Sequence, residues 1–351
     1  MVNLTILAGG YTTFVATYFF NTDTNALSLA GQSTTGANPS WIALHPTNSS
    51  ILYTVNENDP GSLQSFTIEK DFLLSPAVDT VSSGGDGPAF TTPLTTGQVA
   101  IMDYNSGTGQ ITPTVSSDAL QFESATPITF PAPVSHPHMA LQNGDEVLVP
   151  DLGADKIWRL NQVAPNTPGD WEIHGFIQQP NGSGPRHIAL KDGFLFTVHE
   201  LASTLTSQRL PPAPNGTTPL ISNFSVIPPN PPAGAAFAAA EILFPNQSLQ
   251  FSGDFIYVSN RNTGTQDSRG DAITIFKTTP EGELSIVDYV FTGLDQIRGM
   301  QLFGENDEFI IAGGYAAGGV AVFQRTGNGN GLKLIARNTD LPTRTSFVWV
   351  H

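Results

Sequence analysis

Short apolar runs separated by turn residues recur along the whole chain. They are rich in Val, Ile, Phe and Tyr, and the clearest examples span 51–55, 146–149, 194–198, 255–258 and 309–312. The 34 glycines and 27 prolines interrupt the sequence so often that few windows are long enough for a helix. This pattern predicts an all-β protein built from many short strands.

A repeated unit organises these runs. Each unit has a first apolar strand, a turn and a second apolar strand that ends in polar residues. Equivalent positions in the first strands are Ile42, Met139, Ile188, Ile242 and Met300. Their separations are 97, 49, 54 and 58 residues, and the first gap contains a degenerate copy at 98–104. A unit of about 50 residues has the size of one four-stranded propeller blade, and 351 residues hold seven such units.

The predicted fold is therefore a seven-bladed β-propeller of four-stranded antiparallel blades, forming a single domain over 1–351. We expect the strand at 346–350 to pair with the N-terminal strands and close the ring, which removes a free sheet edge. The Pro-rich stretch at about 210–233 is interpreted as an insertion loop, either surface decoration or a wall of the site. Two β-sandwiches are the alternative fold, but they do not explain the repeat.

Polar residues at the strand ends are the candidate functional residues. The inner strands of a propeller line its central channel, so equivalent positions converge at one mouth. The second strands end with Glu57, Asp151, His199, Glu200 and Arg261, and the first strands begin with His136, His138, Arg186, His187, Glu241 and Arg298. A single His or Arg at such a position is more often structural. As a group in a chain with 13% charged residues, they favour binding of carboxylate or carbonyl oxygens.

Composition excludes several classes of protein. The chain has no cysteine, which rules out disulfides, thiolate metal sites and a cysteine nucleophile. Thirty acidic residues against 14 basic ones give a net charge of −16, which argues against nucleic acid and anionic membranes as partners. The chain contains no run of 18 apolar residues, so no transmembrane helix is predicted.

No cofactor or metal is predicted. The chain lacks a P-loop, a dinucleotide fingerprint and a Gly-x-Ser-x-Gly elbow. His136 and His138 are two residues apart on a strand and point to opposite faces, so they rarely bind one ion. A calcium ion held by Asp103 and Asp151 in the channel is conceivable but not favoured.

An extracellular location is favoured, with the cytoplasm as the alternative. No signal peptide is visible, because the residues from Val2 onward already have the pattern of a strand. Few lysines, the acidic balance and polar uncharged loops suit a secreted protein. Six Asn-x-Ser/Thr triplets predict a glycoprotein, unless they are unused chance occurrences; they begin at Asn3, Asn48, Asn181, Asn215, Asn223 and Asn246.

Five short strings resemble the seven-bladed propeller lactonase family. They are His-Pro-His at 136–138, Val-Pro-Asp-Leu-Gly-Ala-Asp-Lys-Ile at 149–157, Gly-Pro-Arg-His at 184–187, Glu-Leu-Ala-Ser-Thr at 200–204 and Tyr-Val-Ser-Asn-Arg at 257–261. That family includes propeller-type phosphogluconolactonases, fungal carboxy-muconate lactonizing enzymes and fungal extracellular aldonolactonases. The resemblance spans nearly the whole chain and implies a site at the channel mouth that handles a lactone or its open carboxylate. By motif, its catalytic residues fall on His138, Arg186, Glu200 and Arg261.

We therefore expect a hydrolase that acts on a sugar-acid (aldono-) lactone. His138 or Glu200 would be the base, while Arg186 and Arg261 would hold the carbonyl oxygen or a carboxylate. The remaining candidates would contact the substrate. A carboxy-cis,cis-muconate cycloisomerase is the first alternative, and a non-enzymatic propeller that binds a protein partner is the second. The expected partner is a small molecule, and the oligomeric state is left open.

Overall fold

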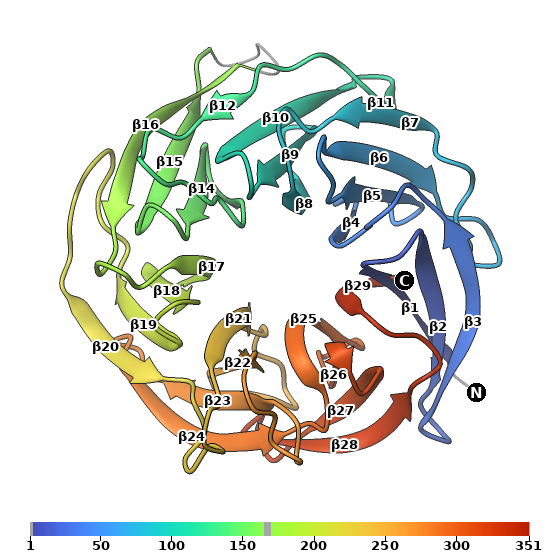
Figure 1. Cartoon of the computed structure of the whole chain (residues 1–351), viewed down its shortest axis with the longest axis vertical. Coiled ribbons are helices and arrows are strands. Elements are labelled where there is room, and N and C mark those ends of the chain that lie inside the picture. The colour runs from blue at the N-terminus through green and yellow to red at the C-terminus, as the bar shows by residue number, and fades with distance from the viewer. Residues whose placement is uncertain (1–2, 165–169, 351) are drawn as a thin grey trace.

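Every regular element of the computed structural model, which describes residues 3–164 and 170–350, is a β-strand. Seven sheets stand in a ring around a common axis (Figure 1). The predicted seven-bladed β-propeller is therefore confirmed. No helix of the described residues is long and apolar enough to cross a membrane.

Within each blade the strands are antiparallel and follow one another outward from the axis (Figure 1). Blade 1 contains β29 (Arg344–Val350), β1 (Asn3–Gly10), β2 (Phe14–Asn21) and β3 (Ala26–Thr34). Blade 2 contains β4 (Ile42–Leu44), β5 (Ile51–Asn56), β6 (Ser62–Thr67) and β7 (Asp79–Ser82). Blade 3 contains β8 (Pro88–Pro93), β9 (Gln98–Asp103), β10 (Thr108–Val115) and β11 (Asp118–Phe122), with the short β12 (Ile128–Thr129) also paired to β10.

The other four blades repeat this order. Blade 4 contains β13 (Leu141–Asn143), β14 (Glu146–Asp151), β15 (Lys156–Gln162) and β16 (Trp171–Gln178). Blade 5 contains β17 (Pro185–Lys191), β18 (Phe194–His199), β19 (Thr204–Arg209) and β20 (Leu220–Ser225). Blade 6 contains β21 (Phe237–Leu243), β22 (Phe255–Asn262), β23 (Ala272–Thr278) and β24 (Leu284–Phe291). Blade 7 contains β25 (Asp295–Phe303), β26 (Phe309–Ala317), β27 (Val320–Thr326) and β28 (Gly331–Asn338).

Both faces of each blade are buried, which explains why the apolar runs are continuous rather than alternating. On β14, Val147 and Val149 pack into the cluster shared with blade 3, whereas Leu148 between them packs into the cluster shared with blade 5. Seven such clusters occur among the described residues, one at each interface between neighbouring blades. The hydrophobic core is therefore divided into layers between the blades.

The C-terminal strand closes the ring, as the sequence predicts. β29 runs antiparallel to β1, with Val350 opposite Thr5. The buried guanidinium of Arg344 strengthens this closure by donating hydrogen bonds to the Ala8 carbonyl at 3.3 Å and to Thr12 Oγ1 at 2.9 Å. Because one terminus completes the sheet that the other begins, β1 has no unpaired edge.

The Pro-rich stretch at 210–233 is only partly a loop. Its segment Leu220–Ser225 forms β20, the outer strand of blade 5, where Ser225 lies opposite Thr204 of β19. The prolines flank this strand rather than interrupt it, because proline has no N–H to donate to a sheet. The interpretation of the whole stretch as an insertion loop is corrected accordingly.

The six asparagines of the Asn-x-Ser/Thr triplets all lie at exposed positions. Their exposure is compatible with glycosylation, which stays a prediction.

Candidate active site

Side-chain alternation at the ends of the second strands decides which polar residues reach the channel mouth. Successive strand residues point to opposite faces. In four blades two consecutive polar residues stand at the end of the second strand, and the second of the two points to the mouth: Glu57, Tyr104, Glu200 and Arg261. The residues that precede them are buried between blades: Asn56, Asp103, His199 and Asn260.

Asp151 and His199, predicted to bind substrate, are both fully buried. Asp151 Oδ1 accepts a hydrogen bond from the backbone N–H of His136 at 2.7 Å, and its Oδ2 accepts one from Trp158 Nε1 at 2.8 Å. His199 Nε2 lies 2.9 Å from Thr206 Oγ1, and burial lowers the pKa of His199 to about 4. Neither side chain lines the pocket described below, so we leave both out of the proposed site.

Glu200 joins two arginines from different blades at the mouth. Its Oε2 lies 2.5 Å from Arg186 Nη1 of blade 5 and 2.7 Å from Arg261 Nη2 of blade 6. Burial alone would raise the pKa of Glu200, but the charges of Arg186 and Arg261 outweigh it and lower that pKa to about 2. Burial and the charge of Arg186 in turn lower the pKa of Arg261 to about 10. Glu200 therefore stays ionised and holds two guanidinium groups side by side.

A buried hydrogen-bonded chain runs from blade 6 to blade 4. Glu241 Oε1 lies 2.7 Å from His187 Nδ1, and His187 Nε2 lies 3.2 Å from His138 Nδ1. Trp41 and Phe90 enclose the His187 ring, with centroids 5.3 and 5.7 Å away. Burial, followed by the charge of Arg186, holds the pKa of His138 well below its ordinary value, so His138 is neutral near pH 7.

These contacts determine which nitrogen of His138 is available. The Glu241 carboxylate can only accept, so His187 Nδ1 carries the proton. With Nδ1 as its donor to Glu241, His187 has Nε2 as the acceptor for the Nδ1–H of His138. His138 Nε2 keeps its lone pair and has no hydrogen-bond partner among the described residues. His138 thus combines a free basic nitrogen with a position on the pocket wall.

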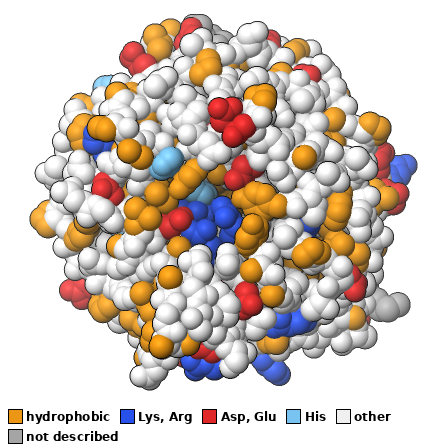
Figure 2. Space-filling view, viewed as in Figure 1, with side chains coloured by type: hydrophobic (Ala, Val, Ile, Leu, Met, Phe, Trp, Pro, Cys, Tyr) orange, Lys and Arg blue, Asp and Glu red, His pale blue; other side chains and the backbone are white. Residues whose placement is uncertain are grey.

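A narrow pocket opens beside His138 and Arg186. Its remaining walls come from blades 1, 2, 3 and 7 and consist of Tyr11, Ser40, Trp41, Glu57, Ala89, Arg298 and Thr345. Tyr11 donates a hydrogen bond to Glu57 Oε2 at 2.8 Å, and burial raises the pKa of Tyr11 so that its hydroxyl stays protonated. Figure 2 shows Lys and Arg side chains gathered in a hollow at the centre of this face, with His beside them.

The other predicted substrate-binding residues lie in, behind or beside the pocket. Glu57 and Arg298 line the pocket as predicted candidates should. His187 and Glu241 lie behind His138 and are not among the residues lining the pocket; His187 contacts His138, and Glu241 contacts His187. His136 stacks on Tyr104 with a centroid distance of 4.4 Å, beside the mouth.

Three aromatic residues of the site were not predicted from the sequence. Tyr11 and Tyr315 end identical Ala-Gly-Gly-Tyr strings at 8–11 and 312–315, and their rings meet edge to face at 5.4 Å. Trp41 stands one residue before Ile42, the position that holds His138 and His187 in their own units. Both signals are present in the repeat, in the duplicated string and in the shared position before the first strand.

The two acidic residues of the calcium hypothesis sit at the ends of different strands, Asp103 on β9 and Asp151 on β14. Burial raises the pKa of Asp103 to about 7, which disfavours its charged form. Within 3–164 and 170–350, no three His, Asp or Glu side chains are grouped as metal ligands.

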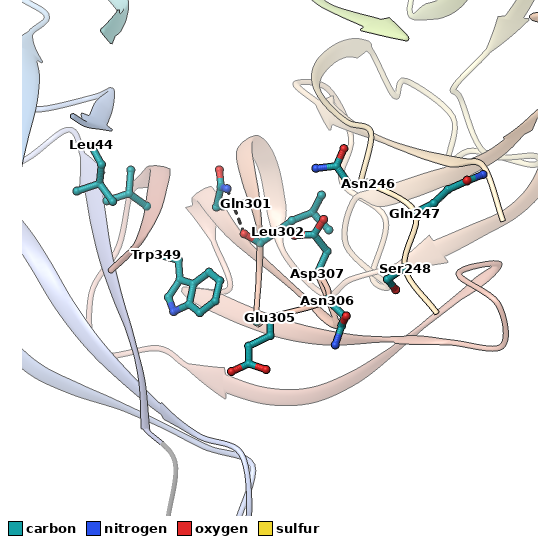
Figure 3. A pocket seen from close by; sticks show the side chains of 12 residues that line it. Leu44, Asn246, Gln247, Ser248, Gln301, Leu302, Glu305, Asn306, Asp307 and Trp349 are labelled. Carbon is teal, nitrogen blue, oxygen red and sulfur yellow. Dashed lines mark hydrogen bonds between the residues drawn. The ribbon is translucent and has the colours of Figure 1, made fainter. Parts of the chain in front are cut away.

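A larger pocket of about 1100 Å³ lies at the opposite ends of the strands (Figure 3). The hairpins β21–β22 and β25–β26 supply most of its wall, including Asn246, Gln301, Glu305 and Asp307, and Trp349 faces it. Among the residues that the structure describes, its lining contains no Lys, Arg or His. Its described polar groups are neutral or acidic, whereas the opposite mouth offers guanidinium groups to a developing oxyanion, so we place the candidate site at the arginine-rich mouth.

Fold and mouth together are those of an enzymatic β-propeller. The chain belongs to the family described as "Lactonase, 7-bladed beta-propeller", which it matches over residues 5–349. A probable 6-phosphogluconolactonase of Arthroderma benhamiae is 26% identical over 325 residues, covering 85% of this chain and 77% of that protein. The 6-phosphogluconolactonase of Bacillus subtilis is 25% identical over 360 residues, covering 95% of this chain and 94% of that protein.

Solved structures show the same fold. The periplasmic gluconolactonase of Pseudomonas aeruginosa has a TM-score of 0.83 at 18% identity and covers 100% of this chain and 99% of its own. The protein is thus a propeller lactonase that takes a small-molecule lactone. The alternative of a non-enzymatic propeller that binds a protein partner is set aside.

Proposed function

We propose that this chain hydrolyses the lactone of a sugar acid, with His138 as the general base. The observation that carries the proposal is the convergence of His138, Arg186, Glu200 and Arg261 from three blades at one buried mouth. The free Nε2 of His138 supplies a base near neutral pH. The paired guanidinium groups supply positive charge where an oxyanion would form.

The proposed reaction begins with attack by water. His138 Nε2 takes a proton from the water as its oxygen bonds to the lactone carbonyl carbon. Arg186 and Arg261 stabilise the resulting oxyanion. When this intermediate collapses, the ring C–O bond breaks, and the His138 imidazolium returns the proton to the leaving alkoxide. One water is consumed, the product is the open hydroxy acid, and His138 is neutral again.

Glu200 acts in this proposal as the residue that positions the arginines. A carboxylate whose pKa is about 2 is a weak base near pH 7, which favours His138 for the proton transfer. The negative charge of Glu200 also offsets the repulsion between the two guanidinium groups. The backing of His138 by His187 and Glu241 stabilises the imidazolium that forms during the reaction.

The proposed substrate carries no phosphate. The relatives from Arthroderma benhamiae and Bacillus subtilis are named for a phosphorylated lactone. Here the mouth has three arginines and no lysine, and two of the arginines are already paired with Glu200. A phosphate dianion would meet only one unpaired guanidinium, so an unphosphorylated sugar-acid lactone fits the charges better.

Proton release from glucono-lactone, measured at neutral pH against the spontaneous rate, tests this function. We expect the wild type to accelerate it and Arg186→Gln to lose about 100- to 1,000-fold in kcat/KM, because one oxyanion donor is removed. Arg269→Gln, which breaks an exposed pair with Asp267, is the matched control and should behave as wild type. Wild type without acceleration on any lactone would overturn the proposal and direct attention to cyclisation of carboxy-muconate, followed by ultraviolet loss of the diene.

A further inference from the structure

Arg298 differs from the two other arginines of the mouth because its guanidinium is not ion-paired with a carboxylate among the described residues. Arg186 and Arg261 are ion-paired with Glu200, whereas Arg298 makes no hydrogen bond or ion pair within the described part of the chain. Its guanidinium nevertheless forms part of the pocket wall. An unpaired guanidinium in a largely buried pocket is available for an anionic group of a ligand.

Two tyrosines from neighbouring blades hold Arg298 in place. The rings of Tyr11 in blade 1 and Tyr315 in blade 7 lie 5.5 and 5.7 Å from its guanidinium carbon, within the range of cation–π attraction. Both tyrosines follow a pair of glycines. A Cβ at Gly10 would lie 1.9 Å from the Thr343 carbonyl oxygen, so only glycine permits this close approach. The repeated Ala-Gly-Gly-Tyr string thus builds a cradle for Arg298.

The charges of the mouth leave one positive charge unmatched. Three guanidinium groups face two carboxylates, those of Glu200 and Glu57, while His138 and Tyr11 are neutral. The wall also contains the buried hydroxyl of Ser40, whose Oγ has no hydrogen-bond partner among the described residues. One guanidinium and one free hydroxyl are complementary to a single carboxylate.

We propose that Arg298, assisted by Ser40, binds a carboxylate of the substrate that is separate from the lactone carbonyl. The preferred substrate is then the lactone of a sugar diacid, which keeps one free carboxylate while the other is closed into the ring. This inference rests on the proposed function, since it assumes that the lactone carbonyl lies at Arg186 and Arg261. Arg298 is accordingly a specificity-determining residue rather than a catalytic one.

Three lactones separate the possibilities: a glucaro-lactone with a free carboxylate, neutral glucono-lactone and 6-phosphoglucono-lactone. We expect wild type to have its highest kcat/KM on the glucaro-lactone. Arg298→Gln should lower that value about 10- to 100-fold, mainly through KM, because one charge-assisted contact is lost. On neutral glucono-lactone the same variant should lose much less, so the ratio of the two kcat/KM values should fall about 10-fold.

An equal loss on the neutral lactone would overturn the proposal, because Arg298 would then act on the lactone carbonyl itself. A wild type that prefers the phosphorylated lactone would also overturn it. Ser40→Ala should show a smaller loss with the same preference, and Arg269→Gln should show none. Thermal melting of each variant checks that the fold is intact.

Calorimetric titration with the open-chain acids tests Arg298 without any turnover. Wild type should bind glucarate, which has two carboxylates, more tightly than gluconate, which has one, and Arg298→Gln should remove that difference. If the wild type hydrolyses no lactone, the proposed function fails while this titration still reports on the carboxylate subsite. If hydrolysis is found but both acids bind equally, the subsite alone is wrong.

Discussion

The two mouths of the central channel have the same architecture and opposite chemistry. Each collects loops and strand ends from several blades. One mouth has Arg186, Arg261 and Arg298 around a buried histidine, with both carboxylates held in specific pairs. The other is lined by Glu305, Asp307 and amides, and the described part of its wall has no basic side chain.

This difference separates what the fold provides from what the residues provide. The ring of blades makes strand ends converge at both mouths, so convergence alone does not create a site. A chain with a net charge of −16 has placed three of its 14 basic residues at one mouth. Lactone opening develops negative charge on the carbonyl oxygen, and that mouth supplies guanidinium groups to stabilise it.

Removing the proposed base, His138, should cause the largest loss of activity. We expect His138→Gln to lower kcat about 1,000-fold, with little change in KM, because the water loses its proton acceptor. In wild type, burial and the charge of Arg186 depress the pKa of His138, so its neutral form persists below pH 6.5. Activity should therefore fall only as the pH drops through that lowered pKa, and it should be retained above it.

The pH profile of kcat/KM, measured from about pH 4 to about pH 8, checks the assignment of the base. The acid limb should be present in wild type and absent in His138→Gln. A limb that survives unchanged in the variant would assign the base to another group, and Glu200 would be the next candidate. Thermal melts separate loss of the base from loss of the fold.

The fold was predictable because its signal is repeated. Five equivalent apolar positions mark the same structural unit in five different blades. Each blade of a propeller buries both of its faces, so the apolar signal is strong in every unit. Convergence of His138, His187 and Glu241 followed from this repeat. The orientation of single side chains did not, since a shift of one residue at a strand end exchanges the mouth for the interior.

Asp151, His199 and Glu241 illustrate that limit. Asp151 and His199 stand beside mouth-facing positions in sequence, yet Asp151 bonds to the loop before β13 and to Trp158 of β15, and His199 bonds to Thr206 of β19. Glu241 has the expected position, but His187 fills the space between it and the pocket. Which of two neighbouring side chains lies next to the pocket depends on tertiary packing, and the spacing of residues along the sequence does not determine it.

A smaller effect is expected from neutralising the residue behind the base. Glu241→Gln keeps an oxygen that can accept from His187 Nδ1 and from the backbone N–H of Ile242, so the geometry should survive. The negative charge that stabilises the His138–His187 pair in its protonated state is lost. We expect kcat to fall about 10- to 100-fold, with KM nearly unchanged, and the acid limb to move to lower pH.

The same pH profiles distinguish this positioning role from a structural one. A purely structural effect would lower stability or KM without moving the acid limb. His199→Asn is the matched control, because His199 is also a buried histidine but bonds to Thr206 away from the pocket. Its kcat and acid limb should match wild type, and a loss comparable to that of Glu241→Gln would restore His199 to the site.

The smallest effect is expected at the opposite mouth, where Glu305→Gln should leave kcat/KM within about twofold of wild type, by the same proton-release measurement. Arg298 begins and Phe303 ends the portion of β25 that separates the two mouths, a rise of roughly 15–20 Å. Charges in contact with solvent are largely screened beyond about 8 Å at physiological ionic strength, so Glu305 should act weakly on the arginines. Any residual change should shrink as salt is added. A large loss that persists in salt would show that the two mouths act together, and the comparison that places all the chemistry at one of them would fail.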